Sequence, residues 1–254
     1  MSANTRDWDA ATYERVSDHQ FQWGIETLDR LELEGSERVL DAGCGSGRVT
    51  RVLRDRLPEG HVVAVDASPS MVDKAREALG AERIEYGVQD LAELRLDEPV
   101  DAILSTAVFH WIPDHDALFA SLHDALKPGG RLEAQCGAEG NISNVRAALA
   151  DITDDAPWDE YFGDWPGPWN FAGSHETKER LEQAGFTDVS CWLQRKTLRS
   201  DEPEAFLRSV TLGTHVERLP EELRNAFVRA VAEYLGAPLE IDYVRLNFSA
   251  RRAA

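Results

Sequence analysis

The amino-acid sequence predicts an α/β fold in which parallel strands are joined by crossover helices. Short apolar runs alternate with helical patterns through residue 137, which is the arrangement that builds such a sheet. A glycine-rich turn follows the first apolar run, at the edge of the sheet where folds of this class bind cofactors. The chain has 254 residues and 43% hydrophobic content, which is enough for one domain with a full core.

The apolar runs mark the expected strands. Five strands are expected before the pattern loosens, at residues 38–43, 61–67, 83–88, 100–107 and 131–137. Two more are expected near the end of the chain, at residues 188–197 and 242–252.

Helical patterns and capping residues mark the expected helices. They are expected at residues 47–57, 69–79, 114–126, 174–185 and 221–235. Around the second helix, Ser68 is placed to cap the first turn, which contains Pro69, and Gly80 ends the last turn. Residues 155–173 are rich in Pro, Gly and Trp, which favours an irregular lid.

The net charge disfavours two classes of partner. At -19, the chain would be repelled by nucleic acid and by anionic membranes, since binding to either needs clustered cations. It has no apolar stretch of about 18 residues, and residues 1–10 have neither a basic start nor an apolar signal core. Cys44, Cys136 and Cys191 form no CxxC pair. These features predict a cytoplasmic location and leave the oligomeric state open.

The glycine-rich turn distinguishes between two ligand classes. The dinucleotide fingerprint is G-x-G-x-x-G, whereas Gly43, Gly45 and Gly47 give G-x-G-x-G, with Arg48 where that fingerprint has its third glycine. Asp41 precedes the turn, and its carboxylate suits a cationic ligand better than a pyrophosphate. S-adenosylmethionine, which carries a sulfonium and an ammonium, fits this charge, and a nicotinamide-dependent oxidoreductase is disfavoured.

Asp66 adds a second acidic group about 20 residues after the turn. A carboxylate at the end of the second strand can accept hydrogen bonds from ribose hydroxyls, which both cofactor classes contain. Capping of the following helix is the alternative role.

Four segments together resemble class I S-adenosylmethionine-dependent methyltransferases. They are "VLDAGCGSGRVT", "AVDASPSMVDKAR", "YGVQDLAEL" and "DAILSTAVFHWIPDHDALFASLHDALKPGGRL". The resemblance implies a Rossmann-like, doubly wound sheet of seven strands, mostly parallel with a reversed last strand. It also implies one domain over residues 1–254, with a cofactor-binding core at 35–137. Substrate-covering elements are then expected at residues 1–34, 138–175 and 198–238.

The resemblance further implies S-adenosylmethionine as cofactor and S-adenosylhomocysteine as product. The residues that it places at the cofactor are Tyr13, Asp41, Gly43, Gly45, Asp66, Ala67, Met71, Gln89, Asp90, Leu91 and Thr106. Among these, Asp41 and the first two glycines of the turn are expected at the methionyl group, Asp66 at the ribose, and Met71 at the adenine. Asp90 is also expected at the adenine, and its alternative role is to cap a turn.

Within that superfamily the chain is most similar to trans-aconitate methyltransferases and related small-molecule carboxyl methyltransferases. Those enzymes carry Gln-Trp where this chain has His110 and Trp111. The resemblance implies that Trp111 helps to hold a substrate carboxylate, with Gln20 or Gln22 as partner. Trp169, in the expected lid, is a further candidate for substrate contact.

His110 has three possible roles: general base, hydrogen-bond donor that orients a carboxylate, or structural filler. A carboxylate acceptor needs no base because it is already deprotonated, whereas a hydroxyl or a protonated amine would need one. We therefore expect O-methylation of a small carboxylic acid. The alternatives are methylation of a hydroxyl or amine with His110 as base, and a non-catalytic protein that binds S-adenosylmethionine.

Other polar residues carry less information. His115 and His123 have no strong metal-ligand spacing, so no metal is expected. Four cations lie in segments expected to cover the pocket, where a positive charge would meet an acidic substrate; the alternative for each is a solvated surface. They are Arg146, Arg195, Lys196 and Arg199.

Overall fold

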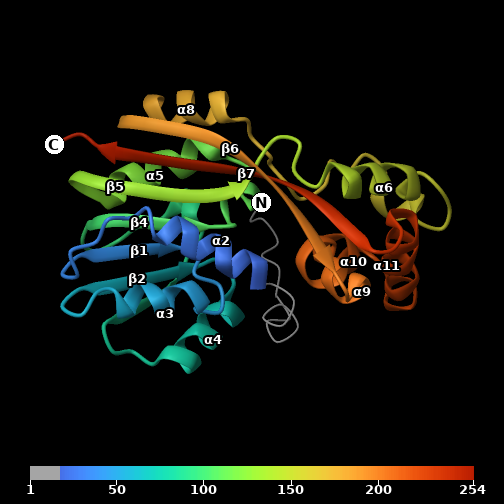
Figure 1. Ribbon diagram of the computed structural model, residues 1–254, viewed down its shortest axis with the longest axis horizontal. Helices are drawn as coiled ribbons and strands as arrows, with labels where there is room; N and C mark the ends of the chain where they lie inside the picture. Colours follow the sequence, from blue (N-terminus) through green and yellow to red (C-terminus); the bar gives the residue numbers. More distant parts are fainter. Residues whose placement is uncertain (1–17) are drawn as a thin grey trace.

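A computed structural model describes residues 18–254 of the chain (Figure 1). Its centre is a seven-stranded sheet with the order β3-β2-β1-β4-β5-β7-β6. The strands are β1 (Arg38–Ala42), β2 (His61–Asp66), β3 (Ile84–Val88), β4 (Val100–Thr106), β5 (Leu126–Gly137), β6 (Phe186–Ser200) and β7 (Leu239–Arg252). Strands β1 to β5 pair in parallel, and β7 runs antiparallel to both β5 and β6. The predicted fold class, including the reversed last strand, is confirmed.

Helices cover both faces of this sheet because its strands β1, β2 and β4 are buried on both sides. They are α2 (Asp18–Leu28), α3 (Arg48–Asp55), α4 (Pro69–Leu79), α5 (His115–Ala125) and α8 (Ser174–Gln183). Neighbouring residues of β1 point to opposite faces. Val39 joins a buried cluster with Leu53 of α3, whereas Leu40 joins a cluster with Leu118 of α5. Two 3-10 turns, η1 (Leu91–Glu93) and η2 (Phe109–Trp111), follow β3 and β4.

A third buried cluster forms beyond the ends of β6 and β7 (Figure 1). Its elements are α6 (Ser143–Thr153), α7 (Asp159–Phe162), α9 (Pro203–Phe206), the π-helix η3 (Leu207–Thr211), α10 (Gly213–Arg218) and α11 (Glu221–Leu235). Strand β7 contributes Ile241 and Tyr243 to this cluster, and its later residue Phe248 packs in the cluster on α5. The long last strand therefore joins the sheet to the helices.

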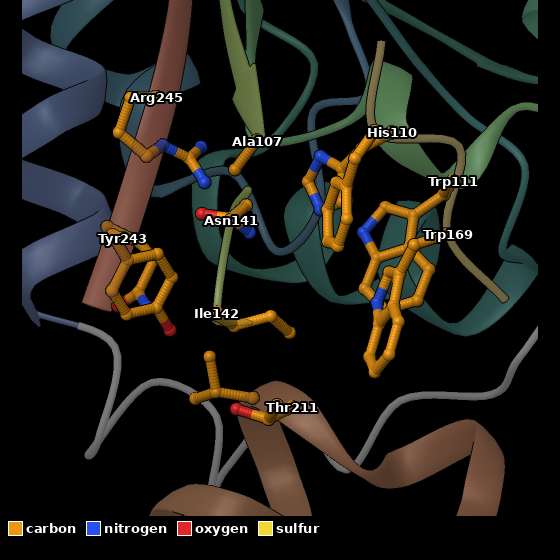
Figure 2. Close-up of a pocket in the computed structure, with 12 residues that line it drawn as sticks. Ala107, His110, Trp111, Asn141, Ile142, Trp169, Thr211, Tyr243 and Arg245 are labelled. Carbon is orange, nitrogen blue, oxygen red and sulfur yellow. The ribbon is translucent and has the colours of Figure 1, made fainter. Parts of the chain in front are cut away.

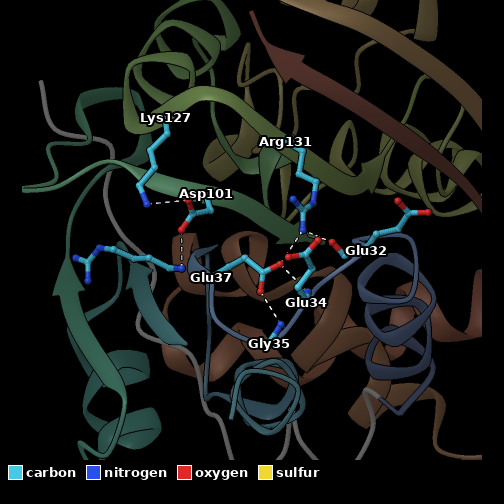
Figure 3. Close-up of polar contacts among 8 residues, drawn as sticks. Glu32, Glu34, Gly35, Glu37, Asp101, Lys127 and Arg131 are labelled. Carbon is cyan, nitrogen blue, oxygen red and sulfur yellow. Dashed lines mark hydrogen bonds and ion pairs between the residues drawn. The ribbon is translucent and has the colours of Figure 1, made fainter. Parts of the chain in front are cut away.

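A polar network fastens the starts of three strands (Figure 3). Asp101, in β4, accepts a hydrogen bond from the backbone N–H of Arg38 at 2.9 Å and pairs with Lys127 Nζ at 2.7 Å. Glu37 accepts from the backbone N–H of Gly35 at 2.8 Å and pairs with Arg131 at 3.1 Å. Burial acts to raise the pKa of Glu37, but these donors hold that pKa below its usual value. The network stabilises the sheet at the ends of the strands opposite the glycine-rich turn.

The strands and helices that were expected agree closely with those observed, with differences at their ends. Helix α7 lies within residues 155–173, which were expected to be irregular. Strand β5 begins at Leu126, where the sequence favours a helix end, because Leu126 pairs with Val100 ahead of a register shift. Ser68 caps α4 as expected, with its Oγ accepting from the N–H of Met71 at 3.4 Å. In the described part of the chain, no helix is both long and apolar enough to cross a membrane. The cytoplasmic location stays a prediction.

Candidate active site

The glycine-rich turn after β1 requires glycine for two different reasons. Gly43, Gly45 and Gly47 all have positive φ, at 88°, 52° and 88°. This is the left-handed region that side chains with a Cβ rarely adopt. A Cβ on Gly43 would lie 2.2 Å from a methyl carbon of Val108, so there the backbone packs against protein. A Cβ on Gly45 would meet no atom of residues 18–254 within 4 Å, so among these residues the bare backbone faces open space that a ligand can fill.

Asp66 links the end of β2 to this turn. Its carboxylate accepts a hydrogen bond from the backbone N–H of Gly45 at 2.9 Å and another from Ser68 at 2.9 Å. Burial raises its pKa despite these donors. Each carboxylate oxygen has more than one acceptor site, so these bonds leave capacity for hydroxyl donors. Ser68, and not Asp66, supplies the side-chain cap of α4.

Asp41 lies beneath the turn with only 1% of its surface exposed. Its carboxylate accepts from the Thr50 hydroxyl at 2.7 Å. Burial raises the pKa of Asp41 to about 6, and the nearby Asp66 carboxylate adds to this against the lowering effect of Thr50. Two carboxylates in one buried region are stabilised by a positive charge. Together with the open backbone of Gly45, these residues fit a cationic ligand.

The remaining predicted cofactor residues lie along the ends of β2, β3 and β4. Met71 and Leu91 are buried and apolar, as an adenine face requires, and Ala67 and Thr106 are half-buried. Gln89 Oε1 accepts from the backbone N–H of Arg95 at 2.9 Å. Asp90 is exposed and caps η1 by accepting from the N–H of Ala92 at 2.9 Å, which is its alternative role. Tyr13 lies outside the described residues.

A pocket opens between the sheet and the helices beyond it (Figure 2). Its empty space is about 450 Å³, solvent at the mouth included. It is lined by Gln20, Ala107, His110, Trp111, Asn141, Ile142, Trp169, Phe171, Val210, Thr211, Tyr243 and Arg245. The fold thus brings together four residues that the sequence singled out, from α2, η2 and the lid. Gln22 is exposed on α2 and is not among the lining residues.

His110 is buried in η2 and held in one orientation. The backbone N–H of Gly137 donates to its Nδ1 at 3.2 Å, and the His110 carbonyl accepts from the N–H of Asn170 at 2.9 Å. Burial lowers the pKa of His110 well below 6.5, and the charge of Arg245 lowers it further. The ring is therefore neutral at pH 7. Because Nδ1 accepts, this network assigns the proton to Nε2.

Aromatic rings form one wall of the pocket. Phe171 stacks on His110 with centroids 5.7 Å apart, and Trp169 stacks on Phe171 at 5.6 Å with 11° between the planes. Trp111 lies 5.1 Å from His110 and 6.3 Å from Trp169. The expected lid therefore reaches the pocket through Trp169 and holds the imidazole in place.

Arg245 is a site residue that the sequence analysis missed. It lies in β7 with 2% of its surface exposed, and its Nη2 donates to Gln135 Oε1 at 2.6 Å. Its guanidinium also lies over the ring of Trp23, 5.3 Å from the centroid. Its position inside the expected last strand, between Val244 and Leu246 in "DYVRLNF", was the available signal, because a charged residue in a strand is rarely buried without a polar partner.

The cations that the sequence did single out lie elsewhere. Arg146 and Arg195 are exposed. Lys196 pairs with Glu26 at 2.5 Å, and Arg199 pairs with Glu240 at 2.7 Å. Within residues 18–254, no group of three or more His, Cys, Asp or Glu side chains is arranged to hold a metal ion.

Comparison with known proteins gives matches over the sheet and beyond it. Residues 39–130 match the family described as "Methyltransferase domain". The trans-aconitate 2-methyltransferase of Variovorax paradoxus (strain S110) is 35% identical over 158 residues, which are 62% of this chain and 60% of that protein. That of Azoarcus sp. (strain BH72) is 33% identical over 236 residues, which are 88% of this chain and 87% of that protein. The match to the Variovorax relative thus spans less than two thirds of its length, whereas the Azoarcus match spans nearly all of it.

Solved structures share the fold at lower identity. Phosphoethanolamine N-methyltransferase 2 of Haemonchus contortus, in complex with S-adenosyl-L-methionine, aligns with a TM-score of 0.61 and 21% identity over 96% of this chain and 56% of that one. A S-adenosylmethionine-dependent methyltransferase of Mesorhizobium loti aligns with a TM-score of 0.56 and 21% identity over 92% of this chain and 99% of that one. At these identities the likeness shows the architecture alone.

Proposed function

Because this chain belongs to the class I S-adenosylmethionine-dependent methyltransferases related to trans-aconitate 2-methyltransferase, we propose that it methylates a carboxylate of a small molecule. S-adenosylmethionine is its cofactor, and when bound it supplies a methyl group already activated on a sulfonium. The protein then has to hold the acceptor oxygen in line with that methyl group, at about 3 Å, and to exclude water.

The chain's own residues fit this cofactor at the turn after β1. The bare backbone of Gly45 allows close approach, and the buried Asp41 provides negative charge for a cation. Asp66 keeps the turn in place through its bond to the N–H of Gly45 and retains acceptor capacity for ribose hydroxyls. The acceptor pocket begins at Ala107, directly after β4, so both sites lie at the carboxyl ends of the parallel strands.

The hydrogen bond from Gly137 to His110 is the observation that carries the proposal. With Nδ1 accepting from the backbone, the neutral ring carries its proton on Nε2 and acts as a hydrogen-bond donor toward an acceptor. A general base would need a free lone pair and a pKa near the working pH. Burial and Arg245 instead lower the pKa of His110 well below 6.5. A carboxylate, which is deprotonated at neutral pH and accepts hydrogen bonds, matches this donor.

The charge of the pocket supports the same acceptor class. Arg245 is a buried cation among the lining residues, and it attracts a carboxylate while repelling an ammonium. Trp111 provides an indole that can cover the apolar part of an acid.

Product analysis tests this proposal. The purified protein is incubated with S-adenosylmethionine and a panel of carboxylic acids, phenols and amines that includes trans-aconitate, and mass spectrometry detects added methyl groups. We expect a methyl ester, which alkali hydrolyses back to the acid. Methylation confined to a phenol or an amine would refute the carboxylate assignment, and cofactor binding without any transfer would point to a non-catalytic role.

A further inference from the structure

Two polar side chains of the pocket have no hydrogen-bond partner in the described part of the chain. Thr211 is 3% exposed, and its hydroxyl makes no hydrogen bond there. Both amide atoms of Gln20 are buried and are likewise unpaired among residues 18–254. Buried polar groups in proteins are nearly always hydrogen-bonded, and isolated ones are costly. Both residues line the same pocket, where a bound ligand can supply the missing partners.

Thr211 occupies an unusual position in the backbone. It is the last residue of the π-helix η3, which continues directly from α9. Single π-turns of this kind occur frequently at functional sites, where the extra residue changes the direction of a side chain. Figure 2 shows Thr211 on the helical side of the pocket, across from His110 and Trp111. Thr211 therefore lies on a different wall of the pocket from His110 and Trp111.

We propose that Thr211 and Gln20 form a distal subsite, which binds an oxygen-bearing group of the acceptor other than the one that is methylated. Gln20 then binds this second group and not the carboxylate held by Trp111, for which the sequence made it a candidate. This inference rests on the proposed function, because it takes His110 and Trp111 as the reacting end. A hydroxyl and an amide N–H both donate, so a carboxylate, carbonyl or hydroxyl oxygen satisfies them together. Thr211 is accordingly a specificity-determining residue.

Binding measurements test the subsite without methyl transfer. The protein is loaded with S-adenosylhomocysteine and titrated calorimetrically with straight-chain acids of about three to six carbons. At each chain length the far end is a methyl group, a hydroxyl or a second carboxylate. We expect that at one length an oxygen-bearing acid binds at least about tenfold more tightly than its plain counterpart, as a pair of buried hydrogen bonds would give. Comparison of the hydroxy acids with the dicarboxylic acids identifies which oxygen group the subsite binds.

Substitutions connect that preference to the named side chains. Thr211→Val keeps the shape and removes the hydroxyl, so it should abolish the preference, whereas Thr211→Ser should retain it. Thr177→Val is the matched control, because Thr177 in α8 is also buried, with a hydroxyl that has no partner within residues 18–254, but does not line the pocket. If Thr211→Val does not fold by circular dichroism, Gln20→Met removes the other donor and should reduce the same preference.

The outcomes separate this inference from the proposed function. Equal affinities at every chain length, or a preference that survives both Thr211→Val and Gln20→Met, would overturn the subsite and leave the two groups to a buried water. Ester formation is measured independently. A Thr211-dependent preference without any ester would remove the proposed function and keep the subsite, and ester formation without the preference would do the reverse.

Discussion

The backbone N–H of Gly137 donates to Nδ1 of His110 over 3.2 Å, at the point where β5 ends beside η2. Gly137 has no room for a side chain, since a Cβ there would lie 2.6 Å from Phe171, the ring that stacks on His110. The glycine thus sets both the tautomer of the imidazole and the space for its aromatic cover. Mutation and pH dependence can therefore test whether His110 acts as a hydrogen-bond donor or as a general base.

If His110 orients a carboxylate, His110→Gln should keep activity within about tenfold, because the amide can replace the lost donor. Burial and Arg245 already lower the pKa of His110, so the ring stays neutral as pH rises through 6.5. We therefore expect no His-dependent rise in kcat near that pH. Initial rates between about pH 5.5 and 8.5 check both points. A loss of about 10² to 10⁴ together with the disappearance of a basic limb would identify a general base.

Arg245→Met should weaken acceptor binding. Removing one charge-assisted bond of about 1.5 to 3 kcal/mol raises the KM for a carboxylate by roughly tenfold or more, with a smaller effect on kcat. Arg245→Lys keeps the charge, and its KM should lie between those of the wild type and Arg245→Met. The control is Arg199→Met, because Arg199 forms an exposed pair with Glu240 outside the pocket. Steady-state kinetics of the folded variants measure the effect, and an unchanged KM in Arg245→Met would contradict an anion-binding role.

The parts of the fold that the sequence could predict are those with strong local signals. The cap of Ser68 and the glycine that ends α4 are short-range features, and the amphipathic pattern of residues 221–235 matches α11 residue for residue. Helices α2, α6, α7, α9 and α10 were not predicted. Two of these, α9 and α10, have only 4 and 6 residues, and neither α6 nor α10 has a side-chain hydrogen bond at its N-cap. Tertiary packing against β7 and α11 decides such elements, and local propensity does not.

The same distinction holds for the site. Asp41, Gly45 and Asp66 belong to contiguous motifs, so their neighbourhood could be inferred from spacing alone. Arg245 meets Gln135 across 110 positions of the chain, and only the pairing of β5 with the reversed β7 brings them together. Thr211 enters the pocket through a π-turn that has no sequence signature in this chain. Residues that a long strand or an irregular turn brings to a pocket cannot be found from periodicity.

Asp41 should make both stability and cofactor binding depend on pH. Its pKa is raised from 3.8 to about 6, a difference of about 2.2 that corresponds to about 3 kcal/mol. Because the folded-state pKa is the higher one, protonation of Asp41 stabilises the folded state. This contribution is complete below about pH 3.8 and is lost as pH rises through about 6. Asp41→Asn keeps an acceptor for Thr50 and removes the charge. Above pH 6, we therefore expect the variant without cofactor to be more stable than the wild type by at most that amount.

Urea unfolding at about pH 5 and pH 7.5 measures the difference between wild type and variant. The same substitution should weaken binding of S-adenosylmethionine more than that of the uncharged-sulfur product S-adenosylhomocysteine, because the sulfonium loses its partner charge. Calorimetry with both ligands compares them. Equal losses for the two ligands would show that Asp41 acts on the shape of the turn and not through its charge.

Asp66→Ala should weaken S-adenosylmethionine binding more than tenfold, since charge-assisted hydrogen bonds of about 1.5 to 3 kcal/mol are lost. The structure adds a second effect, because the bond that holds the N–H of Gly45 is lost as well. Asp66→Asn separates the two, since one amide oxygen still accepts from the backbone while the charge is gone. A folded Asp66→Ala variant with an unchanged dissociation constant would remove Asp66 from the cofactor site.

Alanine at Gly43 should lower stability much more than alanine at Gly45, although the two glycines lie in the same turn. Both positions have positive φ, so each substitution strains the backbone by about 1 to 2 kcal/mol. At Gly43 the new methyl group would also meet Val108 at 2.2 Å, so Gly43→Ala should lower the melting temperature strongly. At Gly45 it meets no atom of the described residues within 4 Å, so Gly45→Ala should fold with a small loss of stability. The space that it enters is where the cofactor approaches, and Gly45→Val, which is bulkier, should abolish binding of S-adenosylmethionine.

Thermal unfolding and cofactor calorimetry on the three variants give the comparison, and a folded Gly45→Val variant that still binds would place the cofactor elsewhere.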